Sequence, residues 1–175
     1  TKAGHDMWPG PYGEWGSRKT IIASIDQSLK RMKLDYVDIF YSHRPDPLTP
    51  IEETMQAFVD VVRQGKALYV GLSKYPPEMA AKAYAYLRER HVPCLVYQGR
   101  YNMIDRNVEP EILPQAEAAG AGFVAFSPLA QGLLTGKYQH GIPEGSRMTH
   151  SGFLKPDVLT PELLDQIAVW GKEAE

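Results

Sequence analysis

The sequence predicts an α/β protein with a parallel sheet, and three observations lead to this fold class. Apolar runs of strand length begin near residues 36, 67, 94 and 122, and amphipathic helical patterns alternate with them strictly. The runs are apolar on both faces, as in strands that are covered on both sides. Their spacing along the chain is nearly constant. Two architectures fit this pattern, a doubly wound sheet and part of a (β/α)8 barrel, and in both the crossovers are right-handed.

Composition narrows the classes of function. The 175 residues suffice for a sizeable core, and we expect residues 1–175 to belong to a single domain. A net charge of −2 gives no indication of a nucleic-acid or membrane partner. The single cysteine, Cys94, allows no internal disulfide and suits a reducing compartment, so we expect a cytoplasmic protein. No apolar run in the sequence approaches the roughly 20 residues of a membrane-spanning helix.

The chain opens with a loop that leads into a helix. Residues 3–16 are rich in Gly and Pro, which predicts a loop. Trp8 and Tyr12 in this loop either fold back on the surface or form a wall of an apolar pocket. Ser17 is the expected N-cap of the helix that follows. The apolar residues of that helix recur at helical spacing: Ile21, Ile22, Ile25, Leu29 and Met32.

The next strand and helix are marked by their boundaries. The strand predicted over residues 36–42 runs into His43, and the prolines that follow cannot continue a strand. Thr49 and Glu52, with a proline between them, then predict a capping box at the start of a helix. Gly65 is the expected end of that helix.

Strands and helices go on alternating along the rest of the chain. They are, in order, a strand over 66–72, a helix over 78–90, a strand over 95–98, a helix over 110–120, a strand over 122–126 and a last helix from residue 160. A long Gly-rich loop is expected between the last strand and the last helix.

Polar side chains stand at one end of the predicted strands. His43, Ser73, Gln98 and Ser127 each lie at the carboxyl end of a strand. A single serine in such a place is usually a turn residue, and a single histidine is usually structural. Four polar residues together are typical of the catalytic face of a (β/α)8 barrel, which lies at the carboxyl ends of the strands.

Several common site motifs are missing from the sequence. Gly120-Ala-Gly122 precedes a strand instead of following one, so it does not fit a dinucleotide fingerprint. The stretch 132–137 is one residue short of a phosphate-binding P-loop. The histidines show no metal-ligand spacing, so we expect no metal site.

Longer motifs extend around the strand ends. They are Thr1-Lys2, His43-Arg-Pro-Asp-Pro47, Gly71-Leu-Ser73, Gln98 with Tyr101-Asn102, and Ser127-Pro-Leu-Ala-Gln-Gly-Leu-Leu-Thr-Gly-Lys-Tyr138. In these motifs the chain resembles the aldo-keto reductases over nearly its whole length. The similarity is greatest to the branch that contains the potassium-channel β subunits and bacterial glyceraldehyde-3-phosphate reductases. The last motif is long and highly specific.

The resemblance implies a fold and a chemistry. The fold is a (β/α)8 TIM barrel without a Rossmann domain, of which this chain would hold about strands 4 to 7 with their helices. The cofactor would be NADP(H), and the small-molecule carbonyl substrate would be an aldehyde or ketone that hydride transfer reduces to an alcohol. In the family a tyrosine protonates the carbonyl oxygen. Lys2 matches the lysine that lowers the pKa of this tyrosine, and His43 matches the histidine that orients and polarises the carbonyl.

The resemblance also implies the cofactor contacts. Ser73 and Gln98 would hold the nicotinamide carboxamide, next to Lys74, where many members have Asn and the channel branch has Arg. Trp8 and Tyr12 are the candidates for the substrate pocket. The pyrophosphate would lie against Ser127, Pro128, Leu129, Ala130, Gln131, Gly132, Lys137 and Arg147.

Two other readings of the chain stay open. A nucleotide-binding regulatory subunit with little turnover, like the channel β subunits, is the first, and the presence of His43 argues mildly against it. A doubly wound binding module without catalysis is the second, and it leaves the match over residues 127–138 as coincidence. A homo-oligomer is possible, and the sequence does not decide between NADP and NAD.

The matched motifs cover only part of a barrel. The catalytic Asp and Tyr of the family lie upstream of the lysine, so we expect them before residue 1, and we expect the last strand after residue 175. Four or five strands cannot close into a barrel of eight. We therefore expect an open barrel sector, with unpaired apolar edges at the strands near 36 and 122. The residues expected to face the missing half are Val37, Ile39, Val124 and Phe126.

We predict that the isolated 175-residue chain does not reduce aldehydes with NADPH, because no tyrosine in it occupies the motif position of the proton donor. Following the oxidation of NADPH by the purified chain, with an aldehyde in excess, tests this. Steady turnover would mean that a tyrosine within the chain, such as Tyr12 or Tyr41, supplies the proton.

Overall fold

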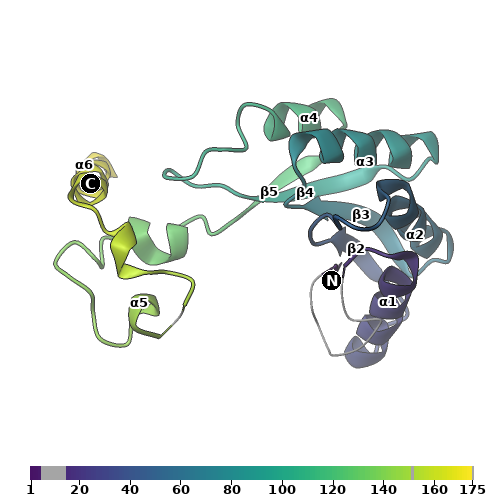
Figure 1. The fold of residues 1–175 in the computed structure, drawn as a ribbon, viewed down its shortest axis with the longest axis horizontal. Coiled ribbons are helices and arrows are strands. Elements are labelled where there is room, and N and C mark those ends of the chain that lie inside the picture. Colours follow the sequence, from purple (N-terminus) through teal and green to yellow (C-terminus); the bar gives the residue numbers. More distant parts are fainter. Residues whose placement is uncertain (5–14, 151, 175) are drawn as a thin grey trace. The chain divides into compact units, whose positions relative to one another are not determined.

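The computed structural model of the protein describes residues 1–4, 15–150 and 152–174, which form two compact units (Figure 1). The first, here called the sheet unit, comprises Thr1–Gly99 and Asn107–Phe126. The second, here called the loop unit, comprises Arg100–Arg106 and Ser127–Glu175. The predicted substrate-pocket residues Trp8 and Tyr12 lie outside the described residues.

A five-stranded sheet forms the centre of the sheet unit. Its strands are β1 (Lys2–Ala3), β2 (Val37–Ser42), β3 (Ala67–Ser73), β4 (Cys94–Arg100) and β5 (Gly122–Phe126). They lie side by side in chain order, and β1 to β4 pair in parallel. A doubly wound sheet reverses its strand order at a switch point, and the order of the described strands contains no such reversal. The sheet is therefore a sector of a (β/α)8 barrel, as predicted.

Four helices form one layer against this sheet. They are α1 (Arg18–Met32), α2 (Ile51–Arg63), α3 (Pro77–Glu89) and α4 (Ile112–Ala118). Each helix packs on the next, so that the layer follows the order of the strands (Figure 1). Phe40 of β2 and Phe58 of α2 are fully buried, and their ring centroids lie 4.9 Å apart. Burying one such side chain contributes about 1.5–3 kcal/mol, so this contact is a main tie between sheet and helix layer.

Cys94 at the start of β4 is also part of this core. Its side chain is buried, and its thiol donates a hydrogen bond of 3.3 Å to the carbonyl oxygen of Val96. Burial raises the pKa of the thiol to about 11. The thiol therefore stays neutral and acts as a small apolar group.

The helix ends differ from the capping pattern that the sequence predicts. Ser17 stands at the N-cap of α1 as expected, but its hydroxyl bonds to Thr20 and makes no capping bond to the backbone. The predicted capping box at Thr49 and Glu52 is wrong, because Pro50 takes the N-cap position and makes no side-chain capping bond. Instead of capping the helix, the hydroxyl of Thr49 donates a hydrogen bond of 2.6 Å to the carboxylate of Asp46.

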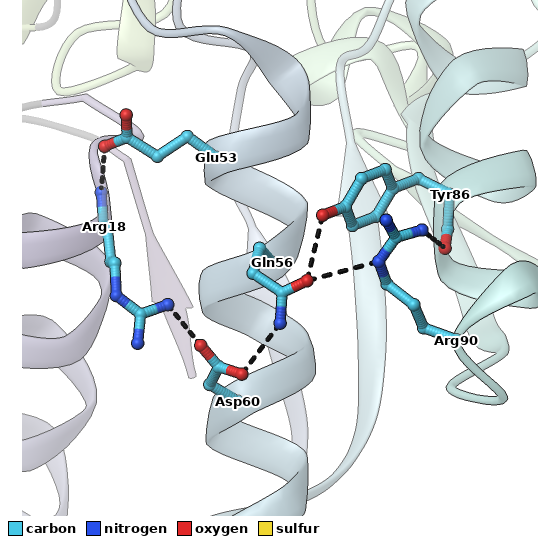
Figure 2. A network of polar contacts seen from close by, with 6 residues as sticks. All are labelled: Arg18, Glu53, Gln56, Asp60, Tyr86 and Arg90. Carbon is cyan, nitrogen blue, oxygen red and sulfur yellow. Dashed lines mark hydrogen bonds and ion pairs between the residues drawn. The ribbon is translucent and has the colours of Figure 1, made fainter.

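A chain of polar contacts runs across three helices of the layer (Figure 2). Arg18 of α1 pairs with Asp60 of α2, and the amide of Gln56 also donates to Asp60. The side-chain oxygen Oε1 of Gln56 accepts hydrogen bonds from Tyr86 of α3 and from Arg90, which follows α3. Desolvation raises the pKa of Asp60, but the bonds from Arg18 and Gln56 outweigh it and hold the pKa below its usual range. Because these groups are partly exposed, the network contributes little stability and mainly orders the helix surfaces.

The loop unit has more regular structure than the predicted Gly-rich loop. It contains the 3₁₀ turns η1 (Ala130–Thr135) and η2 (Pro156–Val158) and the helices α5 (Arg147–His150) and α6 (Pro161–Ala174). The expectation of an irregular loop before the last helix is therefore wrong for these segments. Apolar residues spaced along it make a small core of their own: Leu133, Tyr138, Met148, Leu154 and Ile167.

The edge of the sheet at β2 is partly covered, contrary to the prediction of an unpaired edge. Lys2 and Ala3 pair with the carboxyl end of β2, and the amino group of Thr1 donates to the carbonyl oxygen of Ile39. Val37, which was expected to face a missing half, is buried. The other three residues of that prediction remain accessible: Ile39 and Phe126 are half-buried, and Val124 is 42% exposed.

We predict that Gly71→Ala destabilises the protein by about 1–3 kcal/mol, the usual cost of overpacking. A Cβ atom at Gly71 would lie 2.5 Å from Cδ1 of the Tyr41 ring on the neighbouring strand. Gly122→Ala in β5 is the matched control, since its Cβ atom would lie 3.8 Å from the backbone carbonyl oxygen of Leu95. Urea unfolding of both variants measures the difference. Equal stabilities would show that the Tyr41 ring moves aside freely.

Candidate functional site

The sheet unit gathers four of the predicted site residues at the carboxyl ends of its strands. Lys2 lies in β1, His43 follows β2, Ser73 ends β3, and Gln98 lies near the end of β4. The amide of His43 donates a hydrogen bond of 2.7 Å to the carbonyl oxygen of Ala3. Ser73 and Gln98 are register partners across β3 and β4. Parallel pairing therefore brings residues that are far apart in sequence to one edge of the sheet.

Lys2 lies beside a tyrosine of the neighbouring strand, Tyr41. The Lys2 ammonium lies over the face of the Tyr41 ring, 4.7 Å from its centroid, which is a cation–π contact. Burial raises the pKa of Tyr41 above its ordinary value. A proton donor activated by lysine would have a lowered pKa. The direction of the Tyr41 pKa is opposite to this.

Lys74 has a strained backbone beside Ser73. Its φ of 57° lies in the left-handed region, which costs a non-glycine residue about 1–2 kcal/mol. Its amide donates a hydrogen bond of 3.3 Å to the carbonyl oxygen of Gln98, and its ammonium lies 5.4 Å from the centroid of the Phe126 ring. Strain held by neighbouring contacts is common at ligand-binding turns.

The loop unit holds the second group of predicted residues, from Ser127 onward. Ser127, Ala130, Gln131 and Gly132 all have positive φ angles, between 47° and 103°. Three of these four are not glycine, so the turn stores strain of the kind found at ligand sites. A Cβ atom at Gly132 would lie 3.4 Å from Cε of Lys137, so this lysine lies close to the turn.

A cavity of about 230 Å³ opens beside this turn within the loop unit. Ser127, Ala130 and Gln131 line it, together with Arg100 and Asn102. Leu129 is more than half exposed, and Pro128, Lys137 and Arg147 are also exposed; these four do not line the cavity. Arg147 begins α5 instead of lying in a loop. The cavity therefore does not test the prediction that these four side chains contact the pyrophosphate of the cofactor.

Asn102 is a residue that the predicted site left out. Its side-chain amide donates a hydrogen bond of 3.0 Å to the carbonyl oxygen of Ser127. Its Oδ1 atom accepts hydrogen bonds from the backbone amides of Ile104 and Asp105. These bonds tie the strained turn at Ser127 to the segment around Asn102, within the loop unit. The motif Tyr101-Asn102 marks this position in the sequence. The sequence does not show which atoms the side-chain amide of Asn102 binds.

Asp46 is a second residue whose role becomes visible only in the structure. Its buried carboxylate accepts hydrogen bonds from the amides of Gly16 and Leu48 and from the hydroxyl of Thr49. Thr54 of α2 donates to the carbonyl oxygen of Gly16, which completes a clamp between the starts of α1 and α2. This clamp closes the turn that begins at His43 and so fixes the end of β2.

In the described part of the chain, no group of three or more His, Cys, Asp or Glu side chains is arranged to hold a metal ion. None of the described helices is both long enough and apolar enough to cross a membrane.

A parallel sheet with polar groups gathered at the carboxyl ends of its strands defines part of a (β/α)8-barrel protein with a strand-end site. The chain belongs to the aldo/keto reductase family, whose model matches residues 1–175. It is 56% identical over 167 residues to L-glyceraldehyde 3-phosphate reductase of Escherichia coli strain K12, covering 95% of this chain and 48% of that protein.

Potassium-channel subunits are also similar to this chain. A putative voltage-gated potassium channel subunit beta of Schizosaccharomyces pombe is 40% identical over 165 residues, covering 91% of this chain and 48% of that protein. A probable subunit of the same kind from Arabidopsis thaliana is 46% identical over 142 residues, covering 79% and 43%. The chain thus spans about half the length of these relatives, and the predicted branch of the family is confirmed.

We predict that Asp46→Asn destabilises the protein at neutral pH by about 1.5–3 kcal/mol, because the hydrogen bonds to a buried carboxylate are lost or inverted. Desolvation raises the pKa of Asp46, but the bonds from Thr49, Gly16 and Leu48 outweigh it and lower the pKa. A lowered pKa in the folded state means that the stabilisation is present above the unfolded value of about 4 and is lost as the pH falls through the folded value.

The difference between wild type and Asp46→Asn should therefore shrink at acidic pH, as measured by denaturant unfolding over a pH series. Asp35→Asn, at an exposed position between α1 and β2, is the control and should change stability little. A destabilisation by Asp46→Asn that stays constant down to the lowest pH would contradict the role of the charge.

Proposed function

We propose that the whole protein reduces aldehydes and ketones to alcohols with NADP(H). The observation that carries this proposal is the gathering of Lys2, His43, Ser73 and Gln98 at one edge of the sheet. Family membership and the reductase relative support an oxidoreductase. The preference for NADP(H) over NAD(H) and the carbonyl substrate are part of the proposal.

The residues present fit a nicotinamide cofactor in two places. In the sheet unit, the buried hydroxyl of Ser73 and the half-buried amide of Gln98 are neighbours that can hydrogen-bond a carboxamide. In the loop unit, the turn over residues 127–132 offers backbone groups in left-handed geometry, and Lys137 adds a cation for phosphate. When bound, NADPH would supply the hydride.

The remaining groups act on the carbonyl. His43 would donate a hydrogen bond to the carbonyl oxygen and orient it, which stabilises the negative charge that develops there. Lys2 would keep a cation close to the proton donor and so lower the pKa of that donor. Lys74, Pro128, Leu129, Ala130 and Arg147 are proposed as further cofactor contacts, as the family motifs imply.

A regulatory role is the second candidate, and the channel-subunit relatives favour it. A protein of this kind would bind NADP(H) but turn it over slowly. The two candidates differ in single-turnover rate: rapid oxidation of bound NADPH by an aldehyde indicates an enzyme, and binding without oxidation indicates a regulatory subunit.

We predict that His43→Ala lowers kcat for aldehyde reduction by roughly 10²–10⁴-fold in the whole protein, the usual contribution of a positioned polar catalyst. The affinity for NADPH should barely change, because His43 is proposed to contact the substrate. Steady-state kinetics and fluorescence titration with NADPH measure the two quantities. Wild-type kcat, or an equal loss of cofactor affinity, would refute the assignment.

We predict that Lys137→Ala weakens NADP(H) binding by about 1–3 kcal/mol, the scale of one charge-assisted hydrogen bond. Lys155→Ala is the matched control, an exposed lysine elsewhere in the loop unit. Calorimetric titration compares the two variants. If both bind NADPH as the wild type does, Lys137 is an ordinary surface charge.

A further inference from the structure

Three buried hydroxyl-bearing residues form a hydrogen-bonded chain beneath the strand ends of the sheet unit. The hydroxyls of Ser42 and Tyr75 share a hydrogen bond of 2.8 Å. The hydroxyl of Tyr97 donates a bond of 2.7 Å to the backbone carbonyl oxygen of Tyr75. All three residues are at most 3% exposed. Nothing in the proposed chemistry uses them directly.

Each member of the chain stands next to a candidate site residue. Ser42 ends β2, Tyr75 follows β3, and Tyr97 lies in β4, so the chain crosses three neighbouring strands at one level. The adjacent pairs are Ser42 with His43, Lys74 with Tyr75, and Tyr97 with Gln98. The hydrogen bonds therefore join the backbone segments that carry the site.

We propose that Ser42, Tyr75 and Tyr97 are positioning residues, which hold His43 and the Ser73–Gln98 pair in the relative placement that the reaction needs. This inference rests on the proposed function.

The geometry of Tyr75 carries the argument. Its side-chain hydroxyl is tied to β2 and its backbone carbonyl is tied to β4. The turn after β3 therefore cannot shift without breaking one of two buried hydrogen bonds. Lys74 stands in this turn in the left-handed conformation, and strained residues of this kind persist only where the surrounding contacts fix them.

The hydroxyls in this chain do not titrate in the working range of an enzyme. Burial raises the pKa of Tyr75 to about 12 and the pKa of Tyr97 to about 12. Both phenols are therefore neutral near pH 7, and their hydrogen bonds persist over that range. A change of pH should not loosen the chain.

The two bonds of Tyr75 should have separable effects. The bond between Ser42 and Tyr75 adjoins His43, which is proposed to orient the carbonyl. The bond from Tyr97 to the carbonyl oxygen of Tyr75 adjoins the Ser73–Gln98 pair, which is proposed to hold the carboxamide. Loss of the first bond should lower kcat, and loss of the second should weaken cofactor binding.

Substitutions that remove single hydroxyls test this in the whole protein. We expect Ser42→Ala and Tyr75→Phe each to lower kcat about three- to tenfold and to leave the NADPH dissociation constant unchanged, as the loss of one hydrogen bond implies. Tyr97→Phe should raise the NADPH dissociation constant by a similar factor, with kcat at saturating NADPH unchanged. The double variant Ser42→Ala with Tyr75→Phe should be no slower than either single variant, because both remove the same bond.

Tyr84→Phe is the matched control. Tyr84 is a buried tyrosine of α3 whose hydroxyl has no hydrogen-bond partner among the residues that the structure describes. Its replacement by Phe removes the same atom at similar burial and should change neither kcat nor NADPH affinity. Amide hydrogen exchange at Lys74 gives a readout without turnover: exchange should speed up in Tyr97→Phe and Tyr75→Phe and stay unchanged in Tyr84→Phe.

The inference is overturned if the three substitutions lower only the melting temperature, or if Tyr84→Phe reproduces their effects. Ser42→Ala is the smallest change and decides the matter if Tyr75→Phe does not fold. The proposed function fails separately, when the wild-type protein neither binds NADPH nor reduces any of a set of aldehydes.

Discussion

Parallel pairing in chain order is the constraint on which the other features of the sheet unit depend. Because each of the strands β1 to β4 pairs in parallel with its neighbour, their carboxyl ends come to the same edge of the sheet. The same pairing places helices α1 to α4 in one layer, where each packs on the next. This pairing brings His43 and Ser73 to the same edge of the sheet, so their placement does not require a direct bond between their side chains.

The strands and the strand-end residues could be predicted from the sequence, because both depend on local patterns. β5 has the predicted bounds, and Gly65 follows the end of α2 with the positive φ expected of it. The contacts of Thr49 and Asn102 could not be predicted, since their partners lie in segments that only the fold brings close. The bonds of Tyr75 could not be predicted either, because they depend on the positions of Ser42 and Tyr97 on the neighbouring strands.

The loop beyond β5 shows a different limit of sequence reasoning. Its glycines predicted freedom of the backbone, yet Ser127, Ala130 and Gln131 adopt left-handed conformations without being glycine. Such conformations depend on contacts such as the bond from Asn102 and the packing around Tyr138, which no local pattern describes. Family motifs could mark this stretch as important, but they could not indicate its shape.

The buried thiol of Cys94 can report local opening of the sheet. It is the only cysteine in the sequence, it lies at the amino end of β4, and its thiolate form is suppressed by burial. A thiol reagent can modify it only when β4 separates from its neighbours, because the reactive species is the exposed thiolate. The labelling rate of Cys94 therefore reports how often the centre of the sheet opens, and no label has to be engineered into the sheet.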